Sequence, residues 1–354
     1  MTNNIGRKNI KLDKKKGLGG SIKRSNMTAV LVVLILLILI ASVASRYFLD
    51  IYNIQALLRD LSFVGMIAVG QSMLLLVGEL DLSVGKIASL TGIVTGMMMV
   101  YGGWNSWLSL LLGLVFGTLL GILNGIIITK LRLNSMVATI GMQGVYGGIN
   151  LVLTRGKAIT NIPEEIQFLG KGNIGPIPIP FIFTIVILIL VVAFVKKTKT
   201  GRHIYAIGNN REVAKILGIK VDQNRVLIYA MVGFISALAG LLYMARLGSS
   251  QSTVGESWPM NSIAASVIGG VSLSGGIGNP AGALIGAAII ALIQNMIVLF
   301  GVNVYWQSAV SGFVVVIAIS FSSMTEIWRE KQGQKRVQRR MAAEETETKD
   351  VKVE

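Results

Sequence analysis

Long apolar runs recur along almost the whole chain, and they limit its fold more than any other feature. The first of them reads TAVLVVLILLILIASVAS, residues 28–45. About 20 apolar residues in a helix span the hydrocarbon core of a bilayer, because each residue adds 1.5 Å. Only 14% of the residues are charged, against about 25% in ordinary soluble domains. The sequence therefore predicts an all-α polytopic membrane protein.

The apolar runs predict about ten transmembrane helices, at residues 28–45, 61–77, 85–101, 107–129, 135–154, 177–195, 226–247, 260–272, 281–300 and 304–322. The eighth, 260–272, is short and rich in glycine. We expect it to be a broken or re-entrant helix, which is tolerated at membrane depth only inside protein or beside water. The basic start of the chain resembles a signal peptide, but the long first run and the many spans after it favour an uncleaved helix. The predicted regions are a basic tail (1–27), a transmembrane domain (28–322) and a charged tail (323–354).

The positions of the basic residues predict the orientation. If the N-terminus is cytoplasmic, the inner segments carry 27 of the 33 Lys and Arg residues and the outer loops carry six. Cytoplasmic loops are enriched in these residues, so we expect both termini in the cytoplasm. Because the cations flank the spans, the net charge of +16 indicates contact with membrane lipid and not with nucleic acid. Without Cys and with a single His, neither disulfides nor a His-based metal site is expected.

Two short internal matches suggest two pseudo-symmetric halves, a plan in which transporters place the substrate site between the halves. DLSVGKI (81–87) aligns with QSTVGES (251–257), 170 residues later. VGELDLSVG (77–85) aligns instead with IGGVSLSGG (268–276). The first alignment suits two five-span halves of inverted topology and is favoured on that ground, while the second stays open.

The largest predicted cytoplasmic loop, residues 196–225, contains the signals of a short amphipathic helix. Asn209 or Asn210 can cap its N-terminus, and Glu212 falls in the first turn, where it favours the helix dipole. Gly218 suits a left-handed stop. The apolar residues between them share one face: Val213, Ile216 and Leu217. Such a helix can lie on lipid headgroups or insert into a groove of a cytoplasmic partner.

Four motifs occur in order between residues 50 and 322: GELDLSVG (78–85), YAIGNNREVAKILGIKV (205–221), MNSIAASVIGGVSLSGGIG (260–278) and GVNVYWQ (301–307). Together they resemble the permease subunits of bacterial ABC sugar importers of the ribose, galactose and xylose branch. The chain departs from that family at Gly78-Glu79, where many members have Gly-Gly. The extra carboxylate of Glu79 puts a direct transfer of substrate preference in doubt.

The resemblance implies a multi-pass protein of the bacterial cell membrane that pairs with a second permease copy. ABC ATPase subunits would dock on the cytoplasmic loop, and an extracytoplasmic sugar-binding protein would dock outside. The residues implied to couple transport to the ATPase are Asn209, Asn210, Glu212, Ala214, Gly218 and Ile219. We expect ATP to be used by the partner, because GGIGNPAGALIGA (275–287) lacks the Gly-Lys-Ser/Thr ending of a phosphate-binding loop. The chain is thus expected to bind no cofactor and to be no enzyme.

Glu79 and Asp81 interrupt the apolar sequence between the second and third spans. Asp81 and Ser83 can cap the third span by accepting its free N–H groups. Alternatively, the segment is a broken helix beside the translocation path, because charged groups at membrane depth usually face a cavity. The residues predicted to line that path are Glu79, Asp81, Ser83, Gln71, Asn124, Asn150 and Asn295, although each amide can instead form an interhelical hydrogen bond.

The predicted function is import of a monosaccharide, a pentose or a hexose, by alternating access. Within the same family, a nucleoside or an autoinducer furanose is the alternative cargo. Outside it, an ion-coupled secondary transporter would use Glu79 and Asp81 as titratable groups, whereas a scaffold protein of the membrane would need no polar residues facing a pore.

Overall fold

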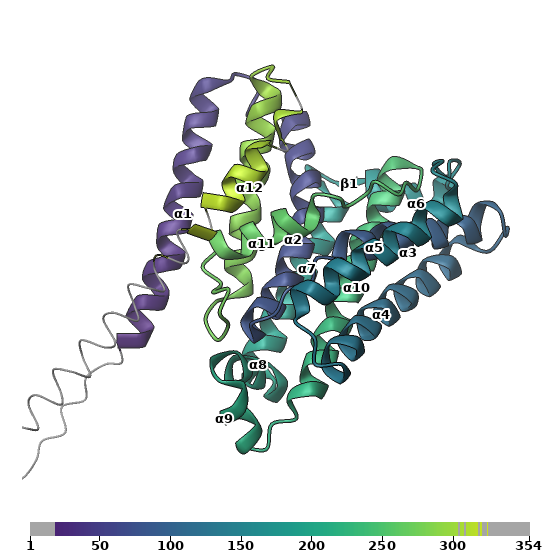
Figure 1. Cartoon of the computed structure of the whole chain (residues 1–354). Helices are drawn as coiled ribbons and strands as arrows, with labels where there is room; N and C mark the ends of the chain where they lie inside the picture. Colours follow the sequence, from purple (N-terminus) through teal and green to yellow (C-terminus); the bar gives the residue numbers. More distant parts are fainter. Residues whose placement is uncertain (1–17, 304, 308, 318, 321–323, 325–354) are drawn as a thin grey trace, which may run out of the picture.

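The computed structural model describes residues 18–303, 305–307, 309–317, 319–320 and 324, and these form a bundle of helices (Figure 1). The helices are α1 (Leu18–Ala44), α2 (Ile51–Val77), α3 (Val84–Val100), α4 (Ser106–Lys130), α5 (Ser135–Thr154), α6 (Glu164–Lys171), α7 (Ile179–Lys197), α8 (Lys199–Asn209), α9 (Arg211–Ile216), α10 (Val221–Leu247), α11 (Trp258–Ile268) and α12 (Pro280–Leu299). Two short strands, β1 (Asn173–Ile174) and β2 (Ile177–Pro178), pair as an antiparallel hairpin. The predicted all-α polytopic fold is confirmed.

Within the described residues, seven helices are long and apolar enough to cross a membrane: α1, α2, α4, α5, α7, α10 and α12. The apolar helix α3 is shorter, with 17 residues. The 11 residues of α11 extend about 16 Å, about half of a hydrocarbon core that is about 30 Å thick. The eighth predicted span is therefore an interrupted helix that ends at Ile268.

The ends of the chain are described only in part. The first helix begins at Leu18, inside the segment predicted as a basic tail. Of the predicted tenth span, residues 306–307, 309–317 and 319–320 are helical. Residues 1–17 of the basic tail, and the charged tail apart from Met324, lie outside the described residues.

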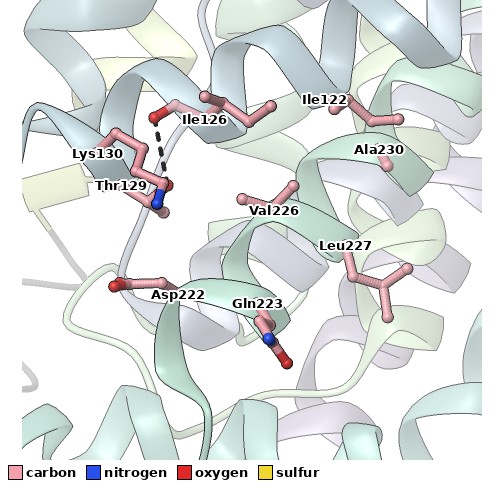
Figure 2. A pocket seen from close by; sticks show the side chains of 9 residues that line it. All are labelled: Ile122, Ile126, Thr129, Lys130, Asp222, Gln223, Val226, Leu227 and Ala230. Carbon is pink, nitrogen blue, oxygen red and sulfur yellow. Dashed lines mark hydrogen bonds between the residues drawn. The ribbon is translucent and has the colours of Figure 1, made fainter.

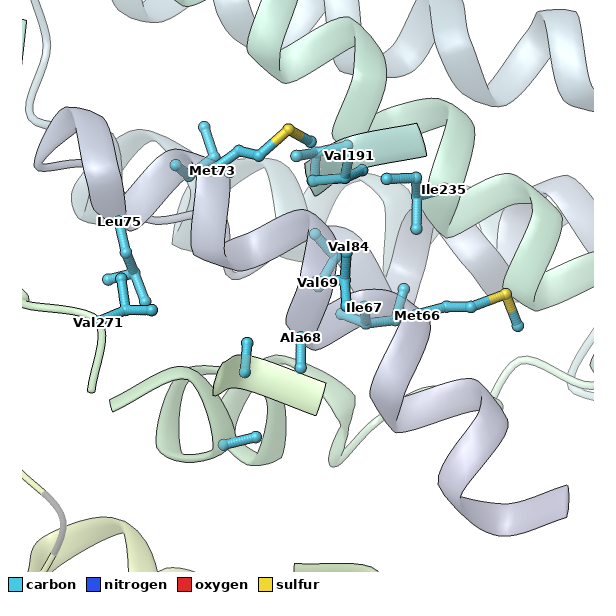
Figure 3. Packing of buried hydrophobic residues seen from close by; sticks show 14 of the residues in the cluster. Met66, Ile67, Ala68, Val69, Met73, Leu75, Val84, Val191, Ile235 and Val271 are labelled. Atoms are coloured by element: carbon cyan, nitrogen blue, oxygen red, sulfur yellow. The ribbon is translucent and has the colours of Figure 1, made fainter. Parts of the chain in front are cut away.

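The second helix, α2, lies at the centre of the bundle. All of its residues from Leu61 to Val77 are buried, because α7, α10, α11 and α12 pack around it. A helix that is apolar on every side is stable when protein covers each of its faces. Figure 3 shows side chains of α2 packed with residues of α3, α7, α10 and the segment after α11: Val84, Val191, Ile235 and Val271.

Glycines at every fourth position of α4 allow close packing on α3 and α10. Gly113, Gly117, Gly121 and Gly125 are all buried. A Cβ atom on Gly125 would lie only 2.9 Å from the Cα atom of Val226 in α10. Small residues let membrane helices approach until their backbones touch, so this glycine ridge fixes the position of α4 within the chain.

The segment that contains α8 and α9 lies at one end of the bundle, near the start of α10, whereas α6 and the β hairpin lie at the other end (Figure 1). The first helix packs along α12, and its N-terminal end points toward the end that carries α8 and α9 (Figure 1). The sequence predicted one short helix in residues 196–225. The structure has two, α8 and α9, which break at Asn210.

Candidate functional site

The turn between α2 and α3, residues 78–83, carries the two predicted carboxylates. Gly78 ends α2 in the left-handed conformation, with φ at 79°, which glycine adopts without strain. The next helix follows with Ser83 at its N-cap position. This reversal leaves the turn inside the protein, where Glu79 and Asp81 are 3% and 0% exposed.

Asp81 and Ser83 form a buried network with Asn124 of α4 and Tyr146 of α5. Oδ1 of Asp81 accepts hydrogen bonds from the backbone N–H and the hydroxyl of Ser83, at 2.7 and 2.6 Å. Nδ2 of Asn124 donates to the Ser83 hydroxyl at 2.8 Å and to Oδ2 of Asp81 at 3.2 Å. The Tyr146 hydroxyl donates to Oδ1 of Asn124 at 2.8 Å. The network thus joins the turn to two neighbouring helices.

Burial raises the pKa of the Asp81 carboxyl above its ordinary value, although the hydrogen bonds from Ser83 and Asn124 oppose this shift. The hydrogen bonds also differ from the capping that the sequence suggested. Ser83 forms no side-chain bond to an N–H group of α3; its hydroxyl instead donates to Asp81 and accepts from Nδ2 of Asn124. Two hydroxyls of α5, on Ser135 and Thr139, instead accept bonds from backbone N–H groups of the turn, at 3.3 and 3.1 Å.

Glu79 is held by two arginines that lie far from it in the sequence. Its Oε1 atom accepts hydrogen bonds from Nε of Arg225 in α10 at 2.5 Å and from Nη2 of Arg211 in α9 at 2.9 Å. The side chains of Glu79 and Arg225 are 2% and 6% exposed, whereas that of Arg211 is 39% exposed. Charges removed from water must be paired. The cluster therefore ties the turn to α9 and α10 together.

Sequence reasoning did not single out Arg211 or Arg225. The available signal was charge, because residues 196–225 hold eight cations and only two carboxylates, Glu212 and Asp222. Such an excess beside a membrane is explained by orientation alone. The pairing with Glu79 depends on contacts across more than 130 positions of sequence, which no local pattern specifies.

The helix α8 rests on the end of α2 and on the segment after α11. The backbone N–H of Gly276 donates to the carbonyl of Leu76 in α2 at 2.9 Å. A Cβ atom on Gly208 of α8 would collide with that carbonyl oxygen. The hydroxyl of Tyr205 in α8 donates to the carbonyl of Gly278 at 3.0 Å. The helix α8 thus contacts both the end of α2 that leads into the α2–α3 turn and the segment that follows α11.

The predicted coupling residues lie in or beside α9. Asn210 is its N-cap, with a side chain that accepts from the N–H of Val213 at 3.0 Å. Gly218 follows the helix with φ at 77°. Ala214 is buried, and Glu212 pairs with a lysine on the surface. The two remaining residues flank the helix: Asn209 ends α8, and Ile219 packs against the core.

The predicted apolar face of α9 points away from the bundle. Val213, Ile216 and Leu217 are 48%, 84% and 71% exposed. The buried Ala214 forms the opposite face. The helix is thus anchored by small and polar residues and presents its large aliphatic side chains outward.

The other predicted path residues lie elsewhere in the bundle. Gln71 is buried in α2, and neither of its amide atoms has a hydrogen-bond partner within the described chain. Asn150 of α5 donates to the hydroxyl of Ser89 in α3 at 2.7 Å. Asn295 of α12 exchanges two hydrogen bonds with Asn53 of α2, at 2.8 and 3.2 Å. The structure therefore brings Asp81, Ser83 and Asn124 together. The side-chain amides of Gln71, Asn150 and Asn295 lie outside that network.

The two segments of the favoured internal alignment touch each other. Gly85 and Gly255 are 170 positions apart, and a Cβ atom on Gly255 would lie 2.8 Å from the carbonyl oxygen of Gly85. Their neighbours Lys86 and Glu256, also equivalent in that alignment, form an ion pair at 3.5 Å. Equivalent residues meet only close to a symmetry axis. These contacts favour the first alignment over the second.

An apolar groove of about 440 Å³ lies between α4 and α10. Figure 2 shows Asp222 and Lys130 at one end of it, and aliphatic side chains along the rest. The predicted site residues do not line this groove.

Comparison with known proteins identifies the family. Residues 53–319 match the family model described as branched-chain amino acid transport system / permease component. The chain is 40% identical over 282 residues to the ribose import permease protein RbsC of Bacillus subtilis, an alignment that covers 79% of this chain and 87% of that protein. It is 33% identical over 302 residues to RbsC of Escherichia coli K12, with 84% and 92% covered.

A third relative carries a different name. The chain is 32% identical over 298 residues to the autoinducer 2 import system permease protein LsrC of Photorhabdus luminescens, with 83% and 88% covered. No solved structure is significantly similar. The matched residues include the α2–α3 turn, α8 and α9. The chain therefore belongs to the branched-chain amino acid transport system / permease component family, and it is a multi-pass permease subunit of the ABC importer type that its motifs predicted.

Proposed function

We propose that this chain is the membrane-spanning permease subunit of an ATP-driven importer that carries a monosaccharide, a pentose in the first place, into the cell. The observation that carries this proposal is the 40% identity to a ribose import permease over 79% of the chain. An autoinducer furanose is the second candidate cargo, supported by 32% identity to the LsrC relative. Both cargoes are small polyhydroxylated molecules, so the chemistry required of the path is the same.

The exposed aliphatic face of α9 is the proposed docking surface for the ATPase subunit. Ile216 and Leu217 are more than two thirds exposed, as expected for a helix that inserts into a groove of its partner. ATP is bound and hydrolysed by that partner, and this chain binds no cofactor of its own. The same end of the bundle is proposed to be cytoplasmic, in agreement with the eight basic residues of segment 196–225.

The opposite end, which carries α6 and the β hairpin, is proposed to receive sugar from an extracytoplasmic binding protein. A second permease copy completes the transporter. Apolar residues on α5 remain exposed in the single chain, among them Val137, Ile140 and Val152. They are available to lipid or to the second copy.

The Glu79 cluster is proposed to transmit the movement of α9 to the transport path. Arg211 belongs to α9, and its partner Glu79 lies two residues before Asp81 in the α2–α3 turn. Because Glu79 and Arg225 are almost completely buried, separating them without a new partner is costly. The Arg225 pair therefore holds the turn on α10, and the Arg211 pair is the contact through which a movement of α9 would displace Glu79 and, with it, the network of Asp81, Ser83 and Asn124.

Uptake of radiolabelled ribose into liposomes tests the proposed function. The permease would be reconstituted with its ATPase, and with its binding protein outside. We expect uptake that requires ATP on the ATPase side and that unlabelled ribose competes. Uptake that proceeds without ATP and follows an ion gradient would overturn the proposal in favour of a secondary transporter. Competition by a furanose autoinducer but not by ribose would assign the second cargo.

Co-purification tests the docking surface separately. Ile216→Glu places a charge in the middle of the exposed face of α9, so we expect loss of the co-purified ATPase. Phe168→Glu is the matched control, because Phe168 is 59% exposed on α6 at the other end of the bundle. Equal recovery of the ATPase with both variants would remove α9 from the docking surface.

A further inference from the structure

A second hollow, distinct in character from the apolar groove, lies beside the C-terminal end of α10. Its volume is about 440 Å³, within the range of about 300–1,000 Å³ that is usual for small-molecule sites. It is lined by the end of α10, the segment 251–257 and the first residue of α11: Tyr243, Leu247, Gln251, Thr253, Val254, Gly255, Glu256, Ser257 and Trp258. The N-terminal end of α10 lies beside α9, and the hollow lies beside its C-terminal end. The hollow is therefore toward the end that is proposed to face the binding protein.

One wall of the hollow is a rigid aromatic cluster. Trp258 stacks on Phe63 of α2 with ring centroids 5.9 Å apart, and Tyr243 meets both rings edge-on at 4.8 and 5.5 Å. The guanidinium of Arg246 stands over the Phe63 and Tyr243 rings at 5.6 and 5.9 Å, and it is held in place by Asp60 at 2.6 Å. Phe63 is 1% and Trp258 7% exposed, so these two rings support the wall from behind, and the half-buried Tyr243 is the ring placed to meet a ligand.

The rest of the lining offers neutral hydrogen-bonding groups with free capacity. In the part of the chain that the structure describes, the hydroxyls of Tyr243, Thr253 and Ser257 have no hydrogen-bond partner. The amide nitrogen of Gln251 donates to Ser249, which leaves its oxygen free to accept. A hydroxyl both donates and accepts, so these groups match a ligand that is itself covered with hydroxyls.

The charges of the lining argue against an ionic ligand. Glu256 is the ionised residue of the lining, and it is already paired with Lys86 at 3.5 Å. The ammonium of Lys86 also donates to the carbonyl of Ser252 at 3.1 Å. A phosphate or an amino acid would find no free cation among the lining residues, whereas a neutral sugar needs none.

The segment 251–257 is also held from behind, which gives the hollow a fixed shape. Gly255 has a positive φ of 75° and lies against the backbone of Gly85 at the start of α3. Ser250, just before the segment, pairs with Ile159 through two backbone hydrogen bonds of 2.8 and 2.9 Å. Occupancy of the hollow is therefore connected to α3, and through it to the α2–α3 turn.

We propose that this hollow is a weak monosaccharide subsite, where sugar released by the binding protein lies against the ring of Tyr243 and bonds the hydroxyls of Tyr243, Thr253 and Ser257. This subsite rests on the proposed sugar-import function and adds the place at which the permease itself first holds the cargo. The binding is expected to be weak, because the hydroxyls are exposed and compete with water. A weak site also lets the sugar move on.

Protection of single cysteines from alkylation tests the subsite directly. The natural chain contains no Cys, so Ser257→Cys and Thr253→Cys each create one reactive thiol in the hollow. Ser45→Cys is the matched control, because Ser45 follows α1, which packs on α12, and neither Ser45 nor these helices line the hollow. Each full-length variant would be reconstituted with the ATPase and labelled with a membrane-impermeant maleimide in D-ribose or in the same concentration of mannitol.

We expect D-ribose to slow labelling at positions 257 and 253 and not at position 45, with about a two-fold effect when the sugar concentration equals its dissociation constant. Tyr243→Phe, which keeps the wall and removes one hydroxyl, should weaken the protection of Cys at 257. Ribose uptake by the wild-type complex, measured in parallel, separates the two proposals. Uptake without any protection would overturn the subsite and leave the import function intact, and absence of uptake would overturn the import function. Protection by the sugar-free binding protein but not by ribose would show a docking surface in place of a sugar subsite.

Discussion

The guanidinium of Arg211 donates a hydrogen bond to the carboxylate of Glu79 at 2.9 Å, although the two residues are 132 positions apart. Arg211 is the first residue of α9, whose aliphatic face is exposed. Glu79 belongs to the buried turn that contains Asp81. A single ion pair thus connects the surface proposed to meet the ATPase with the polar interior of the transmembrane bundle.

Glu79→Gln should destabilise the protein strongly, because Arg225 would stay buried beside a neutral amide. Breaking a buried pair from one side costs about 3–5 kcal/mol, so we expect a loss of about 3 kcal/mol in the free energy of unfolding in detergent. The control is Glu212→Gln, whose partner is a half-exposed lysine and whose effect should stay under about 1 kcal/mol. Equal losses in the two variants would contradict the assignment of the buried pair.

Arg211→Gln separates transmission from stability. Its side chain is 39% exposed, so solvent replaces part of the interaction and the expected loss of stability is about 1 kcal/mol. The ATPase should still co-purify, because the aliphatic face of α9 is untouched, but ribose uptake per ATP hydrolysed should fall at least about ten-fold. Arg202→Gln in the neighbouring helix α8, where Arg202 forms no ion pair among the described residues, should keep normal uptake. Normal uptake by Arg211→Gln would exclude this ion pair from the coupling.

Gly208→Ala should unseat α8 from the end of α2. A Cβ atom there would collide with the carbonyl oxygen of Leu76, which is backbone and has little room to move. We expect a clear fall of the melting temperature in detergent. Gly141→Ala in α5 is the matched control, because no atom lies within 4 Å of its Cβ position and alanine favours a helix by about 1 kcal/mol over glycine. A melting temperature of Gly208→Ala at or above that of the wild type would refute the tight contact.

Tyr146→Phe should weaken the buried network without changing its shape. The lost hydroxyl leaves Oδ1 of Asn124 without its 2.8 Å donor, and an unsatisfied buried acceptor costs about 1–3 kcal/mol. Tyr101→Phe is the control, since Tyr101 is 69% exposed and its hydroxyl can bond water. The two unfolding free energies, measured under the same conditions, should differ by at least about 1 kcal/mol. Indistinguishable values would show that the hydrogen bond contributes nothing.

Gly255→Ala should lower the free energy of unfolding more than Gly270→Ala does, although both glycines have a positive φ, 75° and 86°. Each substitution brings the backbone strain of a left-handed residue, about 1–2 kcal/mol. Only Gly255 also lies against the backbone of Gly85, while no atom lies within 4 Å of the Cβ position at Gly270. The difference between the two unfolding free energies therefore measures the contact between the two aligned segments, and a difference near zero would argue against it.

Local features of the site were predictable from the sequence because they depend on neighbouring residues. Asn210 caps α9 and Gly218 ends it, as the pattern of residues 209–218 indicated. The short eighth span was recognised by its length and its glycines, and it ends at Ile268. The preceding helix α8 is not predicted, although its buried residues Gly201, Ile204 and Ile207 follow a helical spacing.

The capping proposed for Asp81 and Ser83 shows where such reasoning ends. Residue types and spacing suited a helix cap, yet both side chains bond Asn124 of α4, which in turn accepts a hydrogen bond from Tyr146 of α5. The partners of Glu79 were equally out of reach. Two arginines among eight cations in residues 196–225 cannot be distinguished by sequence pattern.

The sequence by itself determined that the chain spans a membrane many times, which loop is the largest on the basic side, and to which family the chain belongs. These properties depend on the length of apolar runs, the sum of charges and short contiguous motifs. The tertiary structure alone decided that Glu79 pairs with Arg211 and Arg225, that Gly85 meets Gly255, and that Tyr243 and Trp258 line one hollow together with Thr253 and Ser257. The physical reason is that a buried charge takes its partner from the side chains that helix packing brings close, and that packing joins residues more than a hundred positions apart.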